Sequence, residues 1–358
     1  MLGGSNGAYA AAADLALSGH RIRLWRRSAA DFEPVLRSGR IRIEGDGVSG
    51  EAVLERATTD LKEVLDGAEV VLVPLPATAQ EDLAARCAPY LASDQVVLLI
   101  PGTLGSLVFA RAVKQAGGTL PWALAETGTL PYLARKVGPA TVRAPVKAAN
   151  LPTGVFPGER STQALSLLSR LYPSIRPCCD ALDAALTNAG TVIHPPLVLL
   201  NAGPIEAGRY DIHASGTTAG ILRVIYAVDA ERIRIREALG YPAPHYELAT
   251  YYEEARAAEG LYGRGAKQKL VRSGLWNERL TLDHRYVSED VALGLTLFTS
   301  LAAAVAVEAP VSRAVVTLSS ALLGRDLQAS GRTVERLGLS GPGVPALREL
   351  FRSGGDLF

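Results

Sequence analysis

Short apolar runs alternate with helical segments in the first half of the chain. Four runs have the length and the apolar content of buried strands, and they lie at residues 22–25, 70–73, 96–100 and 122–125. Helical segments such as 80–91 and 106–115 separate them, and the glycine-containing segment 41–54 predicts an added hairpin. Strands that alternate with helices in this way predict an α/β domain with a doubly wound, parallel sheet.

The pattern changes near residue 165, where strand-like runs give way to longer helical ones. Six segments have helical character, at residues 163–171, 181–207, 217–239, 246–257, 288–307 and 311–323. They predict that an all-α C-terminal domain follows the sheet. We therefore expect two domains, 1–170 and 178–358, with residues 172–177 as the connection between them.

Composition narrows the class of protein. The chain of 358 residues is 48% hydrophobic and 20% charged, which is typical of a globular protein with two ordinary cores. A net charge of +1 provides no field for nucleic acid or an acidic membrane surface, and apolar stretches such as 70–75 and 197–200 are too short to span a bilayer. Three cysteines form neither a disulfide framework nor a metal spacing, and no secretion signal is visible. We expect a cytoplasmic protein without a metal, a nucleic-acid partner or a membrane segment.

A glycine-rich turn opens the chain and leads into an alanine-rich helical stretch. The turn consists of Gly3, Gly4, Ser5, Asn6, Gly7 and Ala8. With the strand at 22–25 it predicts the first βαβ unit of a Rossmann-type domain, in which the backbone approaches a pyrophosphate at a helix N-terminus. Ser5 stands where the second glycine of that fingerprint is expected, so Gly4 and Gly7 are the candidates for the close approach.

Only Met1 and Leu2 precede this turn, whereas a full first strand needs about five residues. Either the strand is short, or the chain starts downstream of its true beginning. A missing strand would remove the central member of the sheet and lower the stability of the domain.

Residues after the strand at 22–25 bear on the choice of dinucleotide. An acidic residue there would bind the adenosine ribose of NAD, but this chain has Arg26, Arg27 and Ser28. Two guanidinium groups and a hydroxyl suit a 2′-phosphate, so we expect NADP(H) to be preferred, with NAD(H) as a second cofactor. The alternative is a solvated basic turn that pairs with Asp31 and Glu33.

Two loops follow predicted strands and contain residues suited to a cofactor cleft. Pro76 lies in the loop 74–78 and Thr103 in the loop 101–105. Ligands of parallel sheets bind beyond the carboxyl ends of the strands. We therefore place both residues in the cofactor site.

His194 is the strongest candidate for proton transfer. It lies within an apolar helical run, and Pro195 and Pro196 follow it directly. An imidazole titrates near neutral pH, so it can both accept and donate a proton. The two prolines predict a break or kink in the helix after the histidine. The alternative is a core histidine that is hydrogen-bonded to the backbone.

Three motifs together resemble those of the opine dehydrogenases, a family that includes the octopine and nopaline dehydrogenases. They are the glycine turn, the motif Asn-Ala-Gly-x-x-x-His-Pro-Pro that ends at Pro196, and the motif Arg-Tyr-x-x-Glu-Asp-Val at residues 285–291. The resemblance covers the whole chain and extends to residues 331–339. It implies NAD(P)H-dependent reductive condensation of an amino acid with a 2-keto acid. It also implies that His194, Arg285 and Asp290 are active-site groups.

Each of these groups has a chemical task in such a reaction. His194 would act as base and acid, and Asp290 would hold the other ring nitrogen of the imidazole. Arg285 would bind a substrate carboxylate through a bidentate fork. The alternatives are a helix first-turn acid for Asp290 and a surface arginine for Arg285. Residues 251–254 form either a helix surface or a wall of the amino-acid pocket.

Two other functions stay open at this point. One is a 2-keto or hydroxy-acid reductase of similar architecture that uses no amine, and the other is an NADP(H)-binding redox sensor without turnover. In each case the partners are small molecules, and the sequence does not identify the amino acid or the keto acid. The apolar helices of the second half could also pack as a homodimer.

Overall fold

The chain folds into two compact units in the computed structural model, which describes residues 1–341 and 343–358. The first unit comprises Met1–Leu75, Ala79–Ala185 and Arg352–Phe358, and the second comprises Pro76–Thr78 and Leu186–Phe351. The first unit continues past residue 170, where the sequence analysis ended the first domain. The reason is that a strand at Ile175–Pro177, within the expected connection, joins its sheet.

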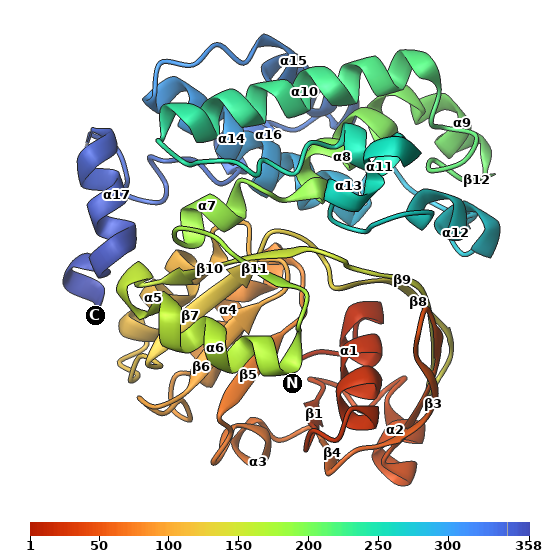
Figure 1. The fold of residues 1–358 in the computed structure, drawn as a ribbon, viewed down its shortest axis with the longest axis vertical. Helices are drawn as coiled ribbons and strands as arrows, with labels where there is room; N and C mark the ends of the chain where they lie inside the picture. The colour runs from red at the N-terminus through yellow and green to blue at the C-terminus, as the bar shows by residue number, and fades with distance from the viewer. Residues whose placement is uncertain (342) are drawn as a thin grey trace. The chain divides into compact units, whose positions relative to one another are not determined.

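The core of the first unit is a largely parallel sheet (Figure 1). Five of its strands are, in spatial order, β11 (Ile175–Pro177), β10 (Leu151–Phe156), β7 (Ala123–Thr127), β6 (Val96–Leu99) and β5 (Val70–Val73). Among these pairs, only β10 and β7 are antiparallel. Every residue of β6 is buried, as expected for a strand covered on both faces. The strands predicted at 70–73, 96–100 and 122–125 correspond to β5, β6 and β7.

Met1 and Leu2 occupy the place of a central strand in this sheet. They lie between β5 and a parallel pair made of β1 (Arg23–Trp25) and β4 (Arg56–Thr58). Leu2 donates a backbone hydrogen bond to the carbonyl of Leu72 at 2.8 Å, and Trp25 donates one to the carbonyl of Met1 at 2.9 Å. The two residues therefore form a short strand that connects both parts of the sheet.

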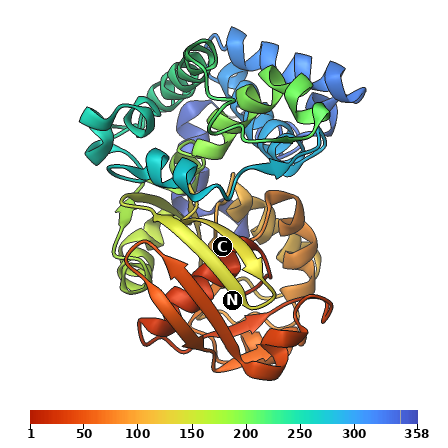
Figure 2. The same cartoon turned by 90° about the vertical axis from the view of Figure 1, so that its right-hand side faces the viewer.

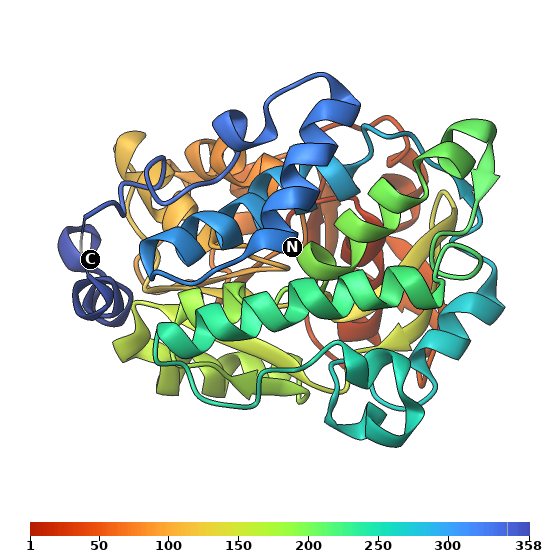
Figure 3. The ribbon, with the colours of Figure 1, turned by 90° about the horizontal axis from the view of Figure 1, so that it is seen from above.

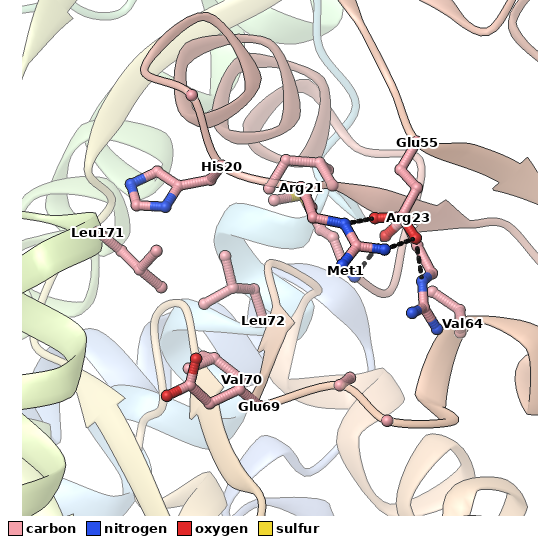
Figure 4. Close-up of a pocket in the computed structure, with 14 residues that line it drawn as sticks. Met1, His20, Arg21, Arg23, Glu55, Val64, Glu69, Val70, Leu72 and Leu171 are labelled. Carbon is pink, nitrogen blue, oxygen red and sulfur yellow. Dashed lines mark hydrogen bonds and ion pairs between the residues drawn. The ribbon is translucent and has the colours of Figure 1, made fainter.

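A cavity of about 350 Å³ lies beside this short strand, with Met1, Leu72 and Arg23 among the residues that line it (Figure 4). Arg21 and Glu55 form an ion pair at its edge, with Nε and Oε2 2.9 Å apart. The amino group of Met1 donates to the carbonyl of Arg23 at 2.7 Å, and burial lowers the pKa of this amino group to about 5.

A second sheet of four strands packs on α1 (Asn6–Leu17), as Figure 2 shows. Its spatial order is β3 (Ser49–Val53), β2 (Arg40–Gly45), β9 (Thr141–Lys147) and β8 (Tyr132–Gly138). The antiparallel pair of β2 and β3 is the predicted hairpin. The sequence analysis missed β8, β9 and β10. β8 and β9 each mix buried residues with exposed or half-buried ones, and charged residues interrupt their apolar residues, so no continuous apolar run marks these strands.

Helices cover the main sheet. They are α2 (Glu33–Ser38), α3 (Leu61–Leu65), α4 (Gln80–Cys87), α5 (Gly105–Gln115), α6 (Ser161–Leu171) and α7 (Ala181–Ala185), with 3₁₀ turns η1 (Ala77–Ala79), η2 (Gly158–Arg160) and η5 (Gly355–Leu357). α5 packs against β7, and α6 packs against β10 and β11. The helices predicted at 80–91 and 106–115 correspond to α4 and α5.

The second unit is helical, and its longest helix is α10 (Ala219–Ala238), which is prominent in Figure 3. Its other α-helices are α8 (Ala189–Leu200), α9 (Ala202–Ala207), α11 (Ala249–Tyr252), α12 (Ala266–Ser273), α13 (Arg285–Ser288), α14 (Thr296–Ala304), α15 (Pro310–Leu323), α16 (Leu327–Ser330) and α17 (Val344–Ser353). The last two residues of α17 lie beyond the second unit. The unit also contains the 3₁₀ helix η3 (Glu254–Glu259) and the π-helix η4 (Asp290–Leu295). Two short antiparallel strands of two residues each, β12 (Arg209–Tyr210) and β13 (Glu278–Arg279), depart from the all-α character predicted for the C-terminal domain.

Several helices are shorter than the sequence analysis predicted. The segment 181–207 forms α7, α8 and α9, because Asn188 caps a new helix and Asn201 separates the last two. The side chain of Asn188 accepts a hydrogen bond from the backbone of Gly190 at 3.0 Å. The expected break after His194 is wrong, since α8 continues through both following prolines to Leu200.

The segment Arg285–Ala304 has the length and hydropathy of a membrane span. In the structure, 72% of an apolar 18-residue stretch of this segment is buried inside the protein. Such burial is typical of a core helix in a globular domain.

Candidate active site

His194 and Asp290 meet in the second unit. Nδ1 of His194, on α8, lies 2.7 Å from Oδ2 of Asp290, the first residue of η4. Both side chains are largely buried, with exposed fractions of 17% and 9%. A carboxylate at Nδ1 fixes the tautomer and the orientation of the imidazole.

Two glycines allow this close approach. A side chain at Gly190 would place its Cβ 3.0 Å from Oδ1 of Asp290 and 3.4 Å from Nδ1 of His194. A side chain at Gly294, within η4, would place its Cβ 2.2 Å from the hydroxyl of Thr191. Glycine at both positions therefore lets α8 and η4 pack closely enough for the His194–Asp290 contact. The π-helical turn is a feature that is often found at functional sites.

Burial governs the electrostatics of the two neighbouring carboxyl groups. It raises the pKa of Asp290 to about 7, and the charge of Arg285 opposes this shift. Burial also raises the pKa of Glu289 to about 7, with the adjacent Asp290 as a further cause. Near neutral pH, either carboxyl group can therefore change its charge in response to a small change in its surroundings.

An aromatic cluster surrounds the imidazole of His194. The ring of Tyr286 stacks on it, with centroids 3.8 Å apart and an interplanar angle of 24°. His213 meets it edge-on at 5.7 Å and also lies 6.4 Å from Trp276. His213 is buried, although the sequence analysis assigned it no role. No sequence spacing links these aromatic residues, so only the fold could reveal the cluster.

Arg285 lies on α13, directly before Tyr286. Its side chain is 42% exposed, and its Nε lies 3.9 Å from Oε2 of Glu289. Its guanidinium carbon also lies 6.0 Å from the centroid of the Tyr286 ring. The structure thus places this cation beside the His194–Asp290 pair, with enough exposure to bind a carboxylate.

Tyr251 and Tyr252 belong to a separate aromatic cluster. Their rings are 5.1 Å apart, and Tyr226 and Tyr262 lie against them at 6.2 and 5.9 Å. The ammonium group of Lys267 lies 4.9 Å from the centroid of the Tyr252 ring. The aromatic pair therefore packs within the unit and is not a simple helix surface.

The glycine turn in the first unit passes close to the end of β5 and leads into α1. Gly3 has a φ of +132°, and a Cβ there would lie 2.7 Å from Leu75. Ser5 caps α1: its hydroxyl accepts from the backbone of Ala8 at 3.1 Å and donates to the carbonyl of Pro74 at 2.8 Å. Ser5 therefore stabilises the helix N-terminus from the position where the fingerprint has a glycine.

Asn6 and Gly7 complete this turn. The side-chain oxygen of Asn6 accepts a hydrogen bond from the backbone of Lys136 at 2.9 Å. A Cβ at Gly7 would meet only the hydroxyl of Ser5, at 3.9 Å, so packing within the protein does not require glycine there.

The basic segment after β1 is partly paired. Nη2 of Arg26 lies 3.6 Å from Oδ2 of Asp31, and the Arg26 side chain crosses Gly4, whose Cβ would lie 2.6 Å from it. Arg27 and Ser28 are exposed. One arginine thus has an acidic partner and the other faces solvent, as in the alternative of a solvated basic turn, and binding of a 2′-phosphate stays a prediction.

Lys136 is a further cation near this turn that the sequence analysis missed. Its ammonium group donates to the carbonyl of Gly4 at 3.2 Å and lies 4.8 Å from the centroid of the Tyr9 ring. Burial, and then the charge of Arg26, lowers the pKa of Lys136. Lys136 belongs to β8, one of the strands that the apolar pattern did not reveal, so its place beside the turn could not be predicted.

The loop after β6 is held in an unusual backbone conformation. Thr103 and Leu104 have φ values of +56° and +62°, a region that residues other than glycine rarely adopt. The buried carboxylate of Glu126 accepts hydrogen bonds from the backbone of Leu104 at 2.8 Å and of Ser106 at 2.9 Å. Strained backbone held this firmly is often found at functional sites. Pro76, the other predicted loop residue, belongs to the second unit.

Among the described residues, no group of three or more His, Cys, Asp or Glu side chains could hold a metal ion.

Comparison with known proteins assigns a family. Residues 177–323 match the model of the NAD/NADP octopine/nopaline dehydrogenase α-helical domain, and residues 3–128 match that of ketopantoate reductase PanE/ApbA. An opine dehydrogenase from Arthrobacter sp. (strain 1C) is 30% identical over 355 residues, which cover 97% of each chain. The chain belongs to the opine dehydrogenase family. Members of this family are NAD(P)-dependent oxidoreductases that condense an amino acid with a 2-keto acid.

Solved structures of this family share the fold. An octopine dehydrogenase in complex with NADH and L-arginine aligns with a TM-score of 0.73 at 19% identity, over 97% of this chain and 96% of that one. A yersinopine dehydrogenase with NADP⁺ bound aligns with a TM-score of 0.66 at 14% identity, over 98% of this chain and 96% of that one. Both enzymes bind a nicotinamide dinucleotide, but not the same one.

Proposed function

We propose that this opine dehydrogenase uses His194 as its general base and acid, oriented by Asp290. The 2.7 Å contact between Nδ1 and the buried carboxylate supports this assignment. The amine of the amino acid must lose a proton before it attacks the keto group, and Nε2 can accept that proton. The carbinolamine must then lose water, and the same nitrogen can return the proton to the departing hydroxyl.

The reduced nicotinamide supplies the hydride that completes the reduction of the resulting imine. Residues of the chain hold and orient the dinucleotide. Gly3 and the N-terminus of α1 suit the pyrophosphate, because small side chains let it approach and the helix N-terminus attracts negative charge. The strained loop at Thr103 follows β6, at the edge of the parallel sheet where the strands have their carboxyl ends.

We propose that NADPH is the preferred cofactor. Arg26, Arg27 and Ser28 follow β1, where a 2′-phosphate would lie, and Lys136 adds a cation beside the turn. Asp31 opposes this preference, since it neutralises part of the charge of Arg26.

Arg285 is proposed to bind a substrate carboxylate. Its partial exposure and its place next to Tyr286 leave the guanidinium fork accessible beside the imidazole. The aromatic groups of His213, Tyr286 and Trp276 form the surroundings of His194, and we propose that they contact the apolar part of a substrate. As the sequence also suggests, we propose a cytoplasmic protein whose partners are small molecules and which can form a homodimer.

A screen of cofactor oxidation over a matrix of 2-keto acids and amino acids tests this function. We expect NADPH oxidation to require both a keto acid and an amine. Reduction of the keto acid alone is the competing activity, which the match of the first domain to ketopantoate reductase favours. Oxidation that is independent of every amino acid tested would support that competing activity.

A further inference from the structure

Glu289 is a buried carboxylate to which the mechanism above gives no task. It is 5% exposed. Its Oε1 accepts a hydrogen bond from the backbone of Ala77 at 2.8 Å. Its Oε2 is buried and has no hydrogen-bond partner among the described residues, and Nε of Arg285 lies 3.9 Å from it. Burying a carboxylate with so little compensation is costly, and such a group in a native structure calls for an explanation.

The hydrogen-bond partner of Glu289, Ala77, lies in a short segment that contacts the helical unit although it follows a strand of the first unit. Ala77 belongs to the segment Pro76–Thr78, which follows β5 and is grouped with the second unit, although the chain on both sides of it belongs to the first. In sheets of this type, the loop after a central strand borders the bound dinucleotide. The hydrogen bond from Ala77 therefore holds the segment that follows β5 against Glu289 within the second unit.

The backbone of Glu289 connects directly to the His194–Asp290 pair. Its backbone carbonyl accepts hydrogen bonds from Leu293 at 2.8 Å and from Gly294 at 3.1 Å, and the second of these spans five residues, as in a π-helical turn. Asp290 is the next residue in the chain. A displacement of Glu289 would therefore move the carboxylate that holds His194.

We propose that Glu289 is a positioning residue that couples the loop after β5 to the His194–Asp290 pair. The inference rests on the proposed role of that pair. Ionised Glu289 holds Ala77 more strongly and disfavours a second negative charge on Asp290, whereas protonated Glu289 relaxes both interactions. The charged groups that act on Glu289 are Asp290, which raises its pKa, and Arg285 and Arg332, which lower it.

Two substitutions separate the hydrogen bond from the charge. Glu289→Leu removes the acceptor for Ala77, and we expect NADPH to bind about tenfold more weakly, as judged by its fluorescence without turnover. Glu289→Gln keeps an acceptor oxygen but removes the charge beside Asp290. We expect its NADPH affinity to stay within about threefold of the parent, and the acid limb of the kcat/KM profile to move down by about half a pH unit or more.

Glu231→Gln is the matched control. Glu231 is also a buried carboxylate of the second unit, and it accepts backbone hydrogen bonds from Val311 at 2.9 Å and Ser312 at 2.8 Å. This variant should lower the melting temperature but leave NADPH affinity and the pH profile unchanged.

Unchanged NADPH affinity in Glu289→Leu, or an unchanged acid limb in Glu289→Gln, would overturn the proposal. The proposal would also fail if Glu231→Gln changed the NADPH affinity and the pH profile as much as the Glu289 variants do. If Glu289→Leu does not fold, Glu289→Gln still decides through its pH profile. A failure of the proposed function is seen separately, as full turnover in a His194→Ala variant, because the affinity measurement with Glu289→Leu does not depend on turnover.

Discussion

The ring of Tyr286 stacks on the imidazole of His194, with centroids 3.8 Å apart and an interplanar angle of 24°. Asp290 approaches the same imidazole at 2.7 Å. One neighbour therefore fixes the plane of the ring and the other fixes its tautomer.

Tyr286→Phe should keep the stacking and nearly all of the turnover. Tyr286→Leu should lower kcat by about three- to tenfold, because an aromatic pair contributes about 0.5–1.5 kcal/mol beyond simple burial. Steady-state kinetics of both variants at saturating substrates provides the measurement. A Phe variant as impaired as the Leu variant would indicate that the hydroxyl of Tyr286, and not its ring, is the functional group.

Gly294→Ala should destabilise the second unit by about 1–3 kcal/mol, since the new methyl group would overlap the hydroxyl of Thr191 in a closely packed site. Thr191→Ala in the same chain should restore part of this loss by removing that hydroxyl. Denaturant unfolding of the single and double variants measures the coupling. Strictly additive effects would argue against the contact.

Burial raises the pKa of Asp290 to about 7, so the ionised form that would orient His194 is the form that lowers the stability of the fold. A carboxyl group whose pKa is higher in the folded state stabilises the protein while it is protonated. That stability is lost as the pH rises from the unfolded pKa, near 4, toward the folded one. Asp290→Asn should therefore raise the melting temperature at pH 8 relative to the parent, with little difference at pH 4. A melting temperature that falls at pH 8 would show that attraction to His194 outweighs the cost of burial.

Cofactor preference depends on the cations near the glycine turn. NADPH should bind about tenfold or more tightly than NADH, because a charge-assisted contact contributes about 1.5–3 kcal/mol. Arg26→Asp should narrow or reverse this preference, and Lys136→Met should reduce it. Dissociation constants for both dinucleotides decide the matter. Equal affinities in the parent protein would contradict the proposed preference.

The main features of the fold could be read from the apolar pattern, because β5, β6 and β7 are buried on both faces and form continuous apolar runs. β8 and β9 contain charged residues among their apolar ones and gave no such signal, so Lys136 beside the glycine turn was missed. The break predicted after His194 was wrong, since α8 continues through the buried Pro195 and Pro196 to Leu200.

The candidate site was partly accessible from the sequence. His194 and Asp290 could be paired through the resemblance of their motifs to a family, although 96 positions separate them. Glu289 lies within one of those motifs, but its bond to Ala77 spans 212 positions. Contacts over such separations depend on the path of the whole chain. No pattern of neighbouring residues in the sequence predicts such contacts.

The central claim is that His194 transfers protons with Asp290 as its partner. Turnover of His194→Ala, measured beside its NADPH dissociation constant and beside the Asp290→Asn and double variants, tests it most directly. We predict that His194→Ala loses about 10²-fold or more in kcat while its NADPH affinity is retained. Asp290→Asn should lose less, and the double variant should be no slower than His194→Ala, because the two residues act as one unit. A His194→Ala enzyme that keeps most of its turnover would contradict the account and make this histidine a core residue of α8.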